Sequence, residues 1–231
     1  ISSQFRVDPI TALKIEVPLL RAKEEKIELI KPIVQIVYNP AQRNIMSIQE
    51  DSQQVQIDQT SLFSLNRFTG FDKQETGLRL NAGVEYLMES ENDMSYSLAF
   101  GQIFRQIKST QFSKASGLSG KKSDILLSGN IGLNNNVSFT GHQLYDQQLN
   151  LKKSETSVNY KNKTSDLRAG VVNYIADPVE GRYQELTELT FEVENKINRY
   201  WSGTVDLRRN LIQNKNINAL LGFTYENECI K

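Results

Sequence analysis

The 231-residue sequence has no long hydrophobic run, and this absence excludes a protein that crosses a membrane with helices. No segment approaches the roughly 18–20 consecutive apolar residues that a transmembrane helix requires. Apolar residues make up 39% of the chain, and the mean hydropathy is −0.46. A transmembrane β-strand needs only about 9–11 residues, of which alternate ones are apolar. A protein that spans a membrane with strands therefore remains compatible with this composition.

The sequence is also poor in the features of catalytic and nucleic-acid-binding proteins. His142 is the only histidine, which excludes a multi-histidine metal site or a histidine-based triad within this chain. We interpret it as a histidine on a polar surface. No glycine-rich turn opens a helix, so nucleotide-binding loops are absent. The 27 acidic and 27 basic residues cancel, and no basic field indicates nucleic acid. We therefore expect no enzyme, no cofactor, no metal and no nucleic-acid partner.

Cysteine occurs once, at Cys229, so the chain cannot form an internal disulfide. A single cysteine indicates either a partner cysteine elsewhere or a buried thiol. The chain does not begin with Met, shows no signal segment and opens on a plausible strand. We interpret it as a fragment that is cut at both ends.

Side chains that alternate between apolar and polar are the dominant pattern. In residues 77–88, Leu78, Leu80, Ala82, Val84 and Tyr86 alternate with polar residues and glycine, and residues 216–226 repeat the pattern. Successive strand residues point to opposite faces, so each segment has one apolar and one polar face. The pattern predicts an all-β protein of about twelve strands, at residues 1–7, 10–20, 27–38, 77–88, 94–105, 123–132, 137–146, 150–161, 166–176, 186–197, 201–209 and 216–226.

The connections between these strands differ in length in a regular way. Short polar turns alternate with longer connections, and all the long ones (39–76, 106–122 and 177–185) fall at the same end of the predicted ribbon. Bacterial outer-membrane barrels have short periplasmic turns and long outer loops. This parity predicts an antiparallel transmembrane β-barrel, in which Cys229 emerges on the periplasmic side.

Aromatic and charged residues agree with a barrel wall. Tyr86, Trp201 and Tyr225 fall at the inferred periplasmic ends of strands, and Tyr38, Phe104 and Tyr145 fall at the outer ends, as in the two aromatic girdles of a barrel. A charge on the lipid face at mid-depth costs about 2–4 kcal/mol. The polar faces, which we expect to line the lumen, carry Arg79, Glu85, Glu192, Glu194, Asp206 and Arg208.

Three other segments have plain structural interpretations. Pro18 and Pro32 lie inside predicted strands, where each removes a ladder donor and favours a bulge or weakened pairing over a functional seam. The segment Gly120–Lys122 reads as a solvated basic loop tip. The long connection 39–76 is dense in acids and aromatics, and we expect it to fold inward or to cap the pore.

Several motifs resemble the barrel of the LPS-assembly protein LptD family. They are EDS at 50–52, LFSLNRFTGFD at 62–72, GLRLNAGVEY at 77–86, FGQIFR at 100–105, GLSGKKSDI at 117–125, DLRRN at 206–210 and LGFTYENEC at 221–229. The resemblance runs from about Ala12 to Cys229. Its loop motif contributes Asp51, Asn66, Arg67, Phe68, Gly70 and Asp72 as candidate site residues.

The resemblance implies a part of a very large outer-membrane barrel, residues 1–231, that places lipopolysaccharide in the outer leaflet of a Gram-negative outer membrane. It implies contact with outer-membrane lipid, an LptE-type plug lipoprotein and the periplasmic Lpt bridge. The bridge would be reached through an upstream jellyroll domain that is absent here, together with the first barrel strands. Cys229 matches the family's C-terminal cysteine region, which pairs with cysteines near the mature N-terminus. Here Ile230 follows it, whereas some members have two adjacent cysteines, so at most one disulfide forms through this region.

Two other functions remain open on these grounds. A passive outer-membrane porin would also show alternating strands and long outer loops. A soluble β-sandwich or lipocalin-like barrel used for binding would place the apolar face inside. Strand length, loop asymmetry and aromatic placement favour the membrane barrel.

Overall fold

The computed structural model describes residues 9–40, 56–68, 73–178 and 181–227. Its elements are strands, and no helix in these ranges is long and apolar enough to cross a membrane. The strands are β1 (Thr11–Glu16), β2 (Leu19–Lys23), β3 (Lys26–Asn39), β4 (Gly77–Ser90), β5 (Ser95–Ser109), β6 (Gly120–Lys122), β7 (Ile125–Gly132), β8 (Val137–Tyr145), β9 (Leu151–Lys161), β10 (Ser165–Tyr174), β11 (Leu186–Lys196), β12 (Trp201–Asn210) and β13 (Lys215–Tyr225).

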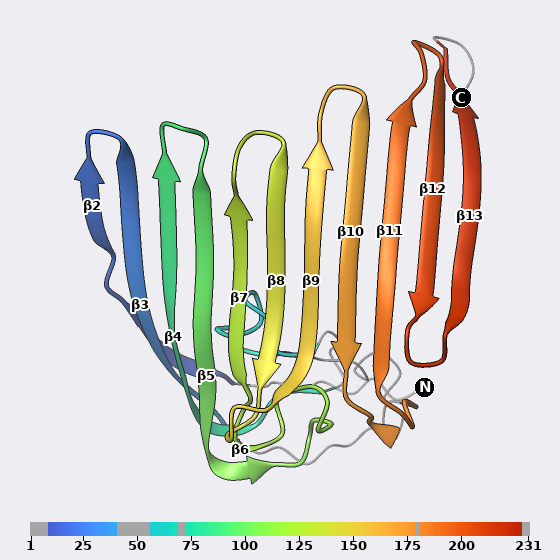
Figure 1. Cartoon of the computed structure of the whole chain (residues 1–231). Helices are drawn as coiled ribbons and strands as arrows, with labels where there is room; N and C mark the ends of the chain where they lie inside the picture. Colours follow the sequence, from blue (N-terminus) through green and yellow to red (C-terminus); the bar gives the residue numbers. More distant parts are fainter. Residues whose placement is uncertain (1–8, 41–55, 69–72, 179–180, 228–231) are drawn as a thin grey trace, which may run out of the picture.

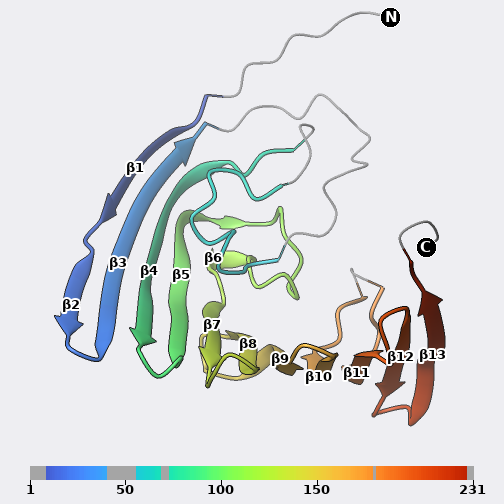
Figure 2. The ribbon, with the colours of Figure 1, turned by 90° about the horizontal axis from the view of Figure 1, so that it is seen from above.

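All thirteen strands belong to one antiparallel sheet whose order follows the sequence. The path runs β1-β3-β4-β5-β7-β8-β9-β10-β11-β12-β13, with β2 paired to β3 and β6 paired to β5 (Figure 1). In Figure 2 the sheet curves like a segment of a cylinder wall, and the described part of it is not closed. This architecture confirms the predicted fold class, an antiparallel β-barrel of which the chain forms a part.

The two ends of the sheet differ as the sequence predicts. The turns that follow β2, β4, β7, β9 and β11 are short and lie together at one end, the short-turn end. The connections that follow β3, β5 and β10 are longer and lie at the opposite end, the long-connection end (Figure 1). The last strand ends at the short-turn end, which is where the parity argument places the C-terminal segment.

The first predicted strands need a correction. Residues 10–20 do not form one strand, because the chain breaks at Pro18 into β1 and β2, which pair with different parts of β3. Pro32 lies opposite this break, and its carbonyl oxygen accepts a hydrogen bond of 3.1 Å from the backbone N–H of Val17. Pro32 causes no bulge toward β4, where it pairs with Val84 in unbroken register. The two prolines therefore weaken only the pairing between β3 and the edge strands.

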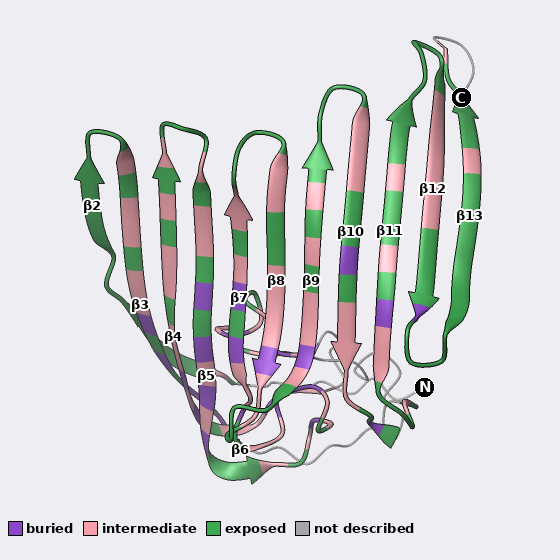
Figure 3. Cartoon of the chain, in the orientation of Figure 1, coloured by how far each residue is buried: buried purple, intermediate pink, exposed green. Residues whose placement is uncertain are grey.

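Two further differences concern the strand count and the chain ends. The short strand β6 was not expected, because residues 120–122 read as a loop tip, and it pairs with a part of β5 that extends to Ser109. The predicted strand at residues 1–7 lies outside the described residues. Buried positions gather in the half of the sheet near the long-connection end (Figure 3), where a folded connection covers the concave face.

Candidate functional site

The convex face of the sheet is apolar and uncovered. Register places opposed residues on one face, as in the row Phe139, Val158, Ala169, Phe191 and Leu207 across β8 to β12. The exposed large side chains of this face include Leu13, Ile15, Val34, Ile36, Tyr38, Leu78, Val84, Leu98, Phe100, Leu127, Phe139, Val158, Val171, Leu189, Phe191, Leu207, Leu221 and Phe223. A soluble monomer seldom exposes a contiguous apolar surface of this extent, because its free energy falls when that surface leaves water.

Aromatic side chains lie at both ends of this convex face. At the short-turn end, Trp201 and Tyr225 are opposed across β12 and β13, with ring centroids 5.1 Å apart. At the long-connection end, Tyr38 is exposed and Lys122 Nζ lies 6.0 Å from the ring centroid of Phe104. Four of the six predicted aromatic residues, Trp201, Tyr225, Tyr38 and Phe104, thus lie toward the ends of the sheet at which they were expected.

The concave face is mainly polar, and the register places there all six residues that we expected to line a lumen. Arg168, Glu192 and Asp206 are neighbours across β10, β11 and β12. Arg168 Nη1 lies 3.6 Å from Glu192 Oε2, and Lys31 Nζ lies 2.7 Å from Glu85 Oε2. Arg208 reaches Glu188 Oε2 at 2.5 Å, Glu194 is exposed, and Arg79 is buried near the long-connection end. Their role as lumen residues remains a prediction.

Residues 56–68, which we call the docked loop, fold onto the concave face near the long-connection end (Figure 2). Their apolar side chains join strand and loop residues in one buried core, comprising Ile57, Leu62, Phe68, Ile103, Phe112, Leu118, Leu126 and Leu144. Polar contacts tie the loop to more distant strands, because Gln56 accepts a hydrogen bond from Lys153 and Gln59 accepts one from Ser128 at 3.3 Å. The expectation that this connection folds inward is met by its described part.

A glycine pair makes the seat for this loop. Gly83 and Gly101 are opposed on β4 and β5, and their missing side chains leave a notch that holds Leu62. A Cβ on Gly101 would lie 2.9 Å from the backbone oxygen of Ala82 and closer still to Leu62. The notch therefore depends on glycine because of close approach.

Substituting Gly101 by alanine is expected to lower the free energy of unfolding by about 1–3 kcal/mol, because the new methyl group overpacks the seat of Leu62. Chemical denaturation and limited proteolysis of the docked loop would measure the effect. Gly141→Ala is the matched control, since nothing lies within 4 Å of a Cβ at that glycine. Equal stability of the two variants would show that the loop is not seated in the notch.

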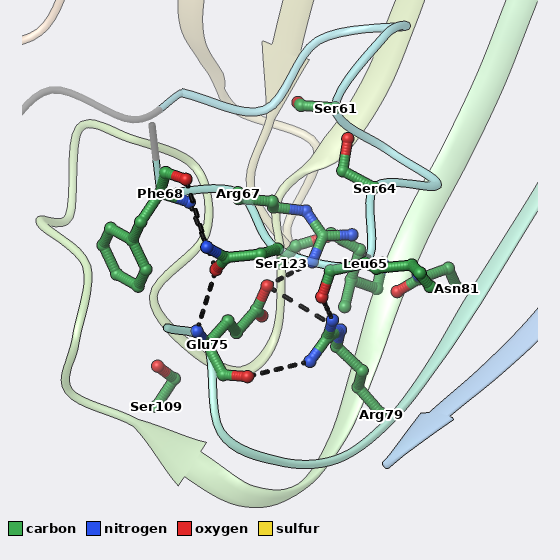
Figure 4. A network of polar contacts seen from close by, with 12 residues as sticks. Ser61, Ser64, Leu65, Arg67, Phe68, Glu75, Arg79, Asn81, Ser109 and Ser123 are labelled. Carbon is green, nitrogen blue, oxygen red and sulfur yellow. Dashed lines mark hydrogen bonds and ion pairs between the residues drawn. The ribbon is translucent and has the colours of Figure 1, made fainter. Parts of the chain in front are cut away.

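Glu75, two residues before the start of β4, is surrounded by three arginines, Arg67, Arg79 and Arg105, of which Figure 4 labels the first two. Arg67 Nη1 donates to Glu75 Oε2, and Arg105 donates to Glu75 Oε1 from Nε at 3.1 Å and from Nη2 at 2.8 Å. Arg79 Nε lies 3.7 Å from Glu75 Oε2, and its Nη1 donates to the Glu75 backbone oxygen at 3.3 Å. We call these four residues the arginine cluster. It joins the docked loop to two strands of the wall.

The arginine cluster also holds the loop backbone. Arg67 Nη2 donates to the backbone oxygen of Leu62 at 2.6 Å, and Arg79 donates to that of Leu65. The side chain of Glu75 is 0% exposed. Burial opposes its ionisation, but the three guanidinium groups outweigh burial and hold the pKa of Glu75 below its ordinary value.

The loop motif contributes three described residues to this region. Arg67 belongs to the arginine cluster, and Asn66 accepts the backbone N–H of Glu75 at 3.0 Å while its own amide donates to the Phe68 backbone oxygen. The Phe68 ring stacks on Phe112, with centroids 4.9 Å apart. Asp51, Gly70, Asp72 and Cys229 lie outside the described residues. The structure thus gives no support to a disulfide, and that pairing stays a prediction.

Two cluster members, Glu75 and Arg105, were missed by sequence reasoning. No signal in the sequence links them to Arg67 and Arg79, because only the register of the folded sheet shows that Arg79 and Arg105 are opposed on neighbouring strands. Opposed like charges destabilise a sheet, so a nearby carboxylate is required. His142 lies opposite Glu155 on the concave face. Within the described ranges, no three His, Cys, Asp or Glu side chains are placed to hold a metal.

Asp124, between β6 and β7, is a partly buried carboxylate near the long-connection end. Burial raises its pKa from 3.8 to about 6, and Asp146 adds to this, although Lys152 at 3.8 Å opposes it. The folded state therefore binds the Asp124 proton more tightly than the unfolded state does. Stability should fall as the pH rises from about 4 to about 6, by up to about 3 kcal/mol.

Asp124→Asn should remove this part of the pH dependence and stabilise the protein at neutral pH. Denaturant midpoints of both proteins across that pH range would measure it. The same slope in the variant would contradict the assignment.

A comparison with family models gives one match. The model described as LptD, LPS transport system D, matches residues 2–201, which is most of the chain. A comparison with curated proteins found no match.

Proposed function

Because this chain belongs to the LptD family of lipopolysaccharide transport proteins, we propose that its sheet forms part of an outer-membrane barrel that inserts lipopolysaccharide into the outer leaflet. The family is a transport and assembly family of the outer membrane, and its members are β-barrels. The specific step, the location of this chain and its orientation are parts of the proposal. The short-turn end would face the periplasm.

The observation that carries the proposal is the separation of the two faces of the sheet. A soluble β-domain turns its apolar face inward, toward its core. Here most of the exposed apolar side chains lie on the convex face, while the concave face is mainly polar and receives the docked loop. The exposed apolar residues on the concave face include Leu20, Ile27, Leu87 and Leu220. A convex apolar wall fits a bilayer, and a concave polar wall fits water and sugar. Lipopolysaccharide needs both surroundings, because its acyl chains must reach the bilayer while its glycan stays hydrated.

The remaining parts of the proposed assembly are suggested by the family resemblance and not by this sheet. We propose that residues 1–231 belong to one larger barrel, with a jellyroll domain upstream that receives lipopolysaccharide from the periplasmic Lpt bridge. An LptE-type lipoprotein would fill the lumen. Cys229 would form a disulfide with a cysteine of the upstream region, and periplasmic oxidation permits such a bond.

Site-specific photo-crosslinking in cells tests the proposal with matched positions. Thr140 and Ser157 are opposed on the concave face, and their neighbours Phe139 and Val158 are opposed on the convex face. A photoreactive residue at Thr140 or Ser157 should capture lipopolysaccharide during its transport. The same residue at Phe139 or Val158 should capture membrane lipid whether or not lipopolysaccharide is being supplied.

Failure to capture lipopolysaccharide at both concave positions would overturn the proposal. Ion conductance through the purified barrel together with that failure would favour a passive porin. Recovery of the folded protein from cells without detergent would contradict a membrane location altogether.

A further inference from the structure

The arginine cluster carries more positive charge than it neutralises. Three guanidinium groups contact one carboxylate, so among the described residues two of the three positive charges have no compensating carboxylate. Glu75 is the only ion-pair partner of Arg67, Arg79 and Arg105 in the described part of the chain. Burying a charge without a partner is costly. The buried excess of positive charge therefore indicates that a second anion, or an anion other than Glu75, can bind between the arginines.

The hydrogen bonding of the cluster points the same way. Arg67 Nε, Arg79 Nε and Arg105 Nη1 are buried, and none of them has a hydrogen-bond acceptor within the described residues. Arg67 and Arg105 are each more than nine-tenths buried. Buried donors are nearly always paired in folded proteins, so one unpaired donor on each arginine needs an explanation.

These donors suit one class of ligand. The planar guanidinium group forms paired hydrogen bonds with carboxylate and phosphate oxygens. A carboxylate offers two oxygens, whereas a phosphate group offers three and a larger negative charge. A phosphate group in place of Glu75 would neutralise more of the cluster and could accept more of its N–H groups.

We propose that Arg67, Arg79 and Arg105 form a phosphate-binding site that Glu75 occupies in this structure. Arg79 and Arg105 are opposed on β4 and β5, so both stay in the wall when the loop side of the cluster moves. Glu75 precedes β4 and is held by Asn66 and by Asn39, which donates to its backbone oxygen at 3.0 Å. The phosphate group belongs either to the headgroup of a lipopolysaccharide or to free phosphate. Binding of a lipopolysaccharide headgroup rests on the function proposed above. Binding of a phosphate group by the three arginines does not depend on that function.

Chemical rescue of Glu75→Ala in the detergent-solubilised full chain tests the site. This variant removes the carboxylate and leaves an anion-sized space between three arginines. Phosphate at constant ionic strength should raise its melting temperature much more than that of the wild type. Glu75→Ala/Arg105→Gln is the matched control, because it leaves the same space but removes one of the three guanidinium groups. It should show only the general stabilisation that phosphate gives to any protein.

Equal gains from phosphate in Glu75→Ala and Glu75→Ala/Arg105→Gln would overturn the site. If Glu75→Ala does not fold, Leu62→Gly supplies a second route. It empties the glycine notch, loosens the docked loop and leaves the four cluster residues intact. Leu62→Gly should then gain a phosphate-dependent stabilisation that Leu62→Gly/Arg105→Gln lacks, and no difference between the two would also overturn the site.

The two phosphate sources are separated by lipid binding to the same variants. Micelles of phosphorylated lipid A should bind Glu75→Ala about tenfold more tightly than Glu75→Ala/Arg105→Gln, a difference of about 1.4 kcal/mol. Dephosphorylated lipid A should bind both variants equally. Rescue by free phosphate without this lipid preference would support the site and overturn the lipid source. That result would leave the crosslinking test of the proposed function unaffected.

Discussion

Glu75→Gln is expected to destabilise the docked loop by about 3–5 kcal/mol, because removing one partner of a buried ion pair leaves the other charges uncompensated. The amide keeps the shape of the side chain but loses the charge that offsets Arg67, Arg79 and Arg105. Hydrogen exchange and protease sensitivity of residues 56–68 should both rise, while the amides of β10 to β13 should keep their protection.

The control for this experiment is Glu85→Gln on the same strand. Glu85 pairs with Lys31 at 2.7 Å, but both side chains reach solvent. A partly exposed pair contributes about 0–1 kcal/mol, so this variant should resemble the wild type. Similar loop exposure in the two variants would refute the anchoring role of Glu75.

The pH dependence of the loop follows from the same cluster. The pKa of Glu75 is lower in the folded state than in the unfolded state. Its contribution to stability is therefore complete above the ordinary pKa of a glutamate and is lost as the pH falls through the folded value. Exposure of the loop to protease should therefore begin only at a pH below the ordinary pKa of a glutamate, and Glu75→Gln should remove that acid transition.

Phe191→Lys is expected to weaken the folded barrel by about 2–4 kcal/mol, since it places a charge on the lipid face near mid-depth. Phe191 lies in the middle of the convex row, with Ala169 and Leu207 on the adjoining strands. The measurement is the denaturant midpoint in lipid bilayers, together with the amount of folded barrel in the outer membrane.

Thr190→Lys, one residue along the same strand, is the control for this substitution. Thr190 faces the concave side, opposite Gly170 and Arg208, where a lysine head can stay in water. This variant should assemble almost normally. Equal loss in both variants would contradict the assignment of the convex face to lipid.

The sheet was largely predictable because the alternation of apolar and polar side chains in each strand reflects the different surroundings of its two faces. Alternation of apolar and polar side chains is enough to identify β4 and β13, and turn lengths are enough to distinguish the two ends of the sheet. The break at Pro18 was not predicted, because whether a proline bends a strand or divides it depends on its partner strand. Here the break faces Pro32, and only the pairing of β3 with β1 and β2 reveals it.

The alternation of apolar and polar residues could not predict the arginine cluster, for a different reason. Arg67 was selected with its loop motif and Arg79 with its strand, but nothing local links either of them to Glu75 or Arg105. Their meeting depends on the register of β4 against β5 and on the seat of Leu62 between Gly83 and Gly101. Contacts of this kind arise from tertiary packing, which one-residue periodicity does not encode.

The sequential order of the strands also constrains how the protein can fold. From β3 to β13, each main strand pairs with the one before it along the wall, so the wall can grow hairpin by hairpin with short chain closures. The docked loop lies early in the chain, yet it contacts Ser128 on β7, Leu144 on β8 and Lys153 on β9. It can find its seat only after the strands that carry these later residues have been placed. The loop should therefore be the last of these elements to become ordered, and the concave face should stay open until the wall beneath it is complete.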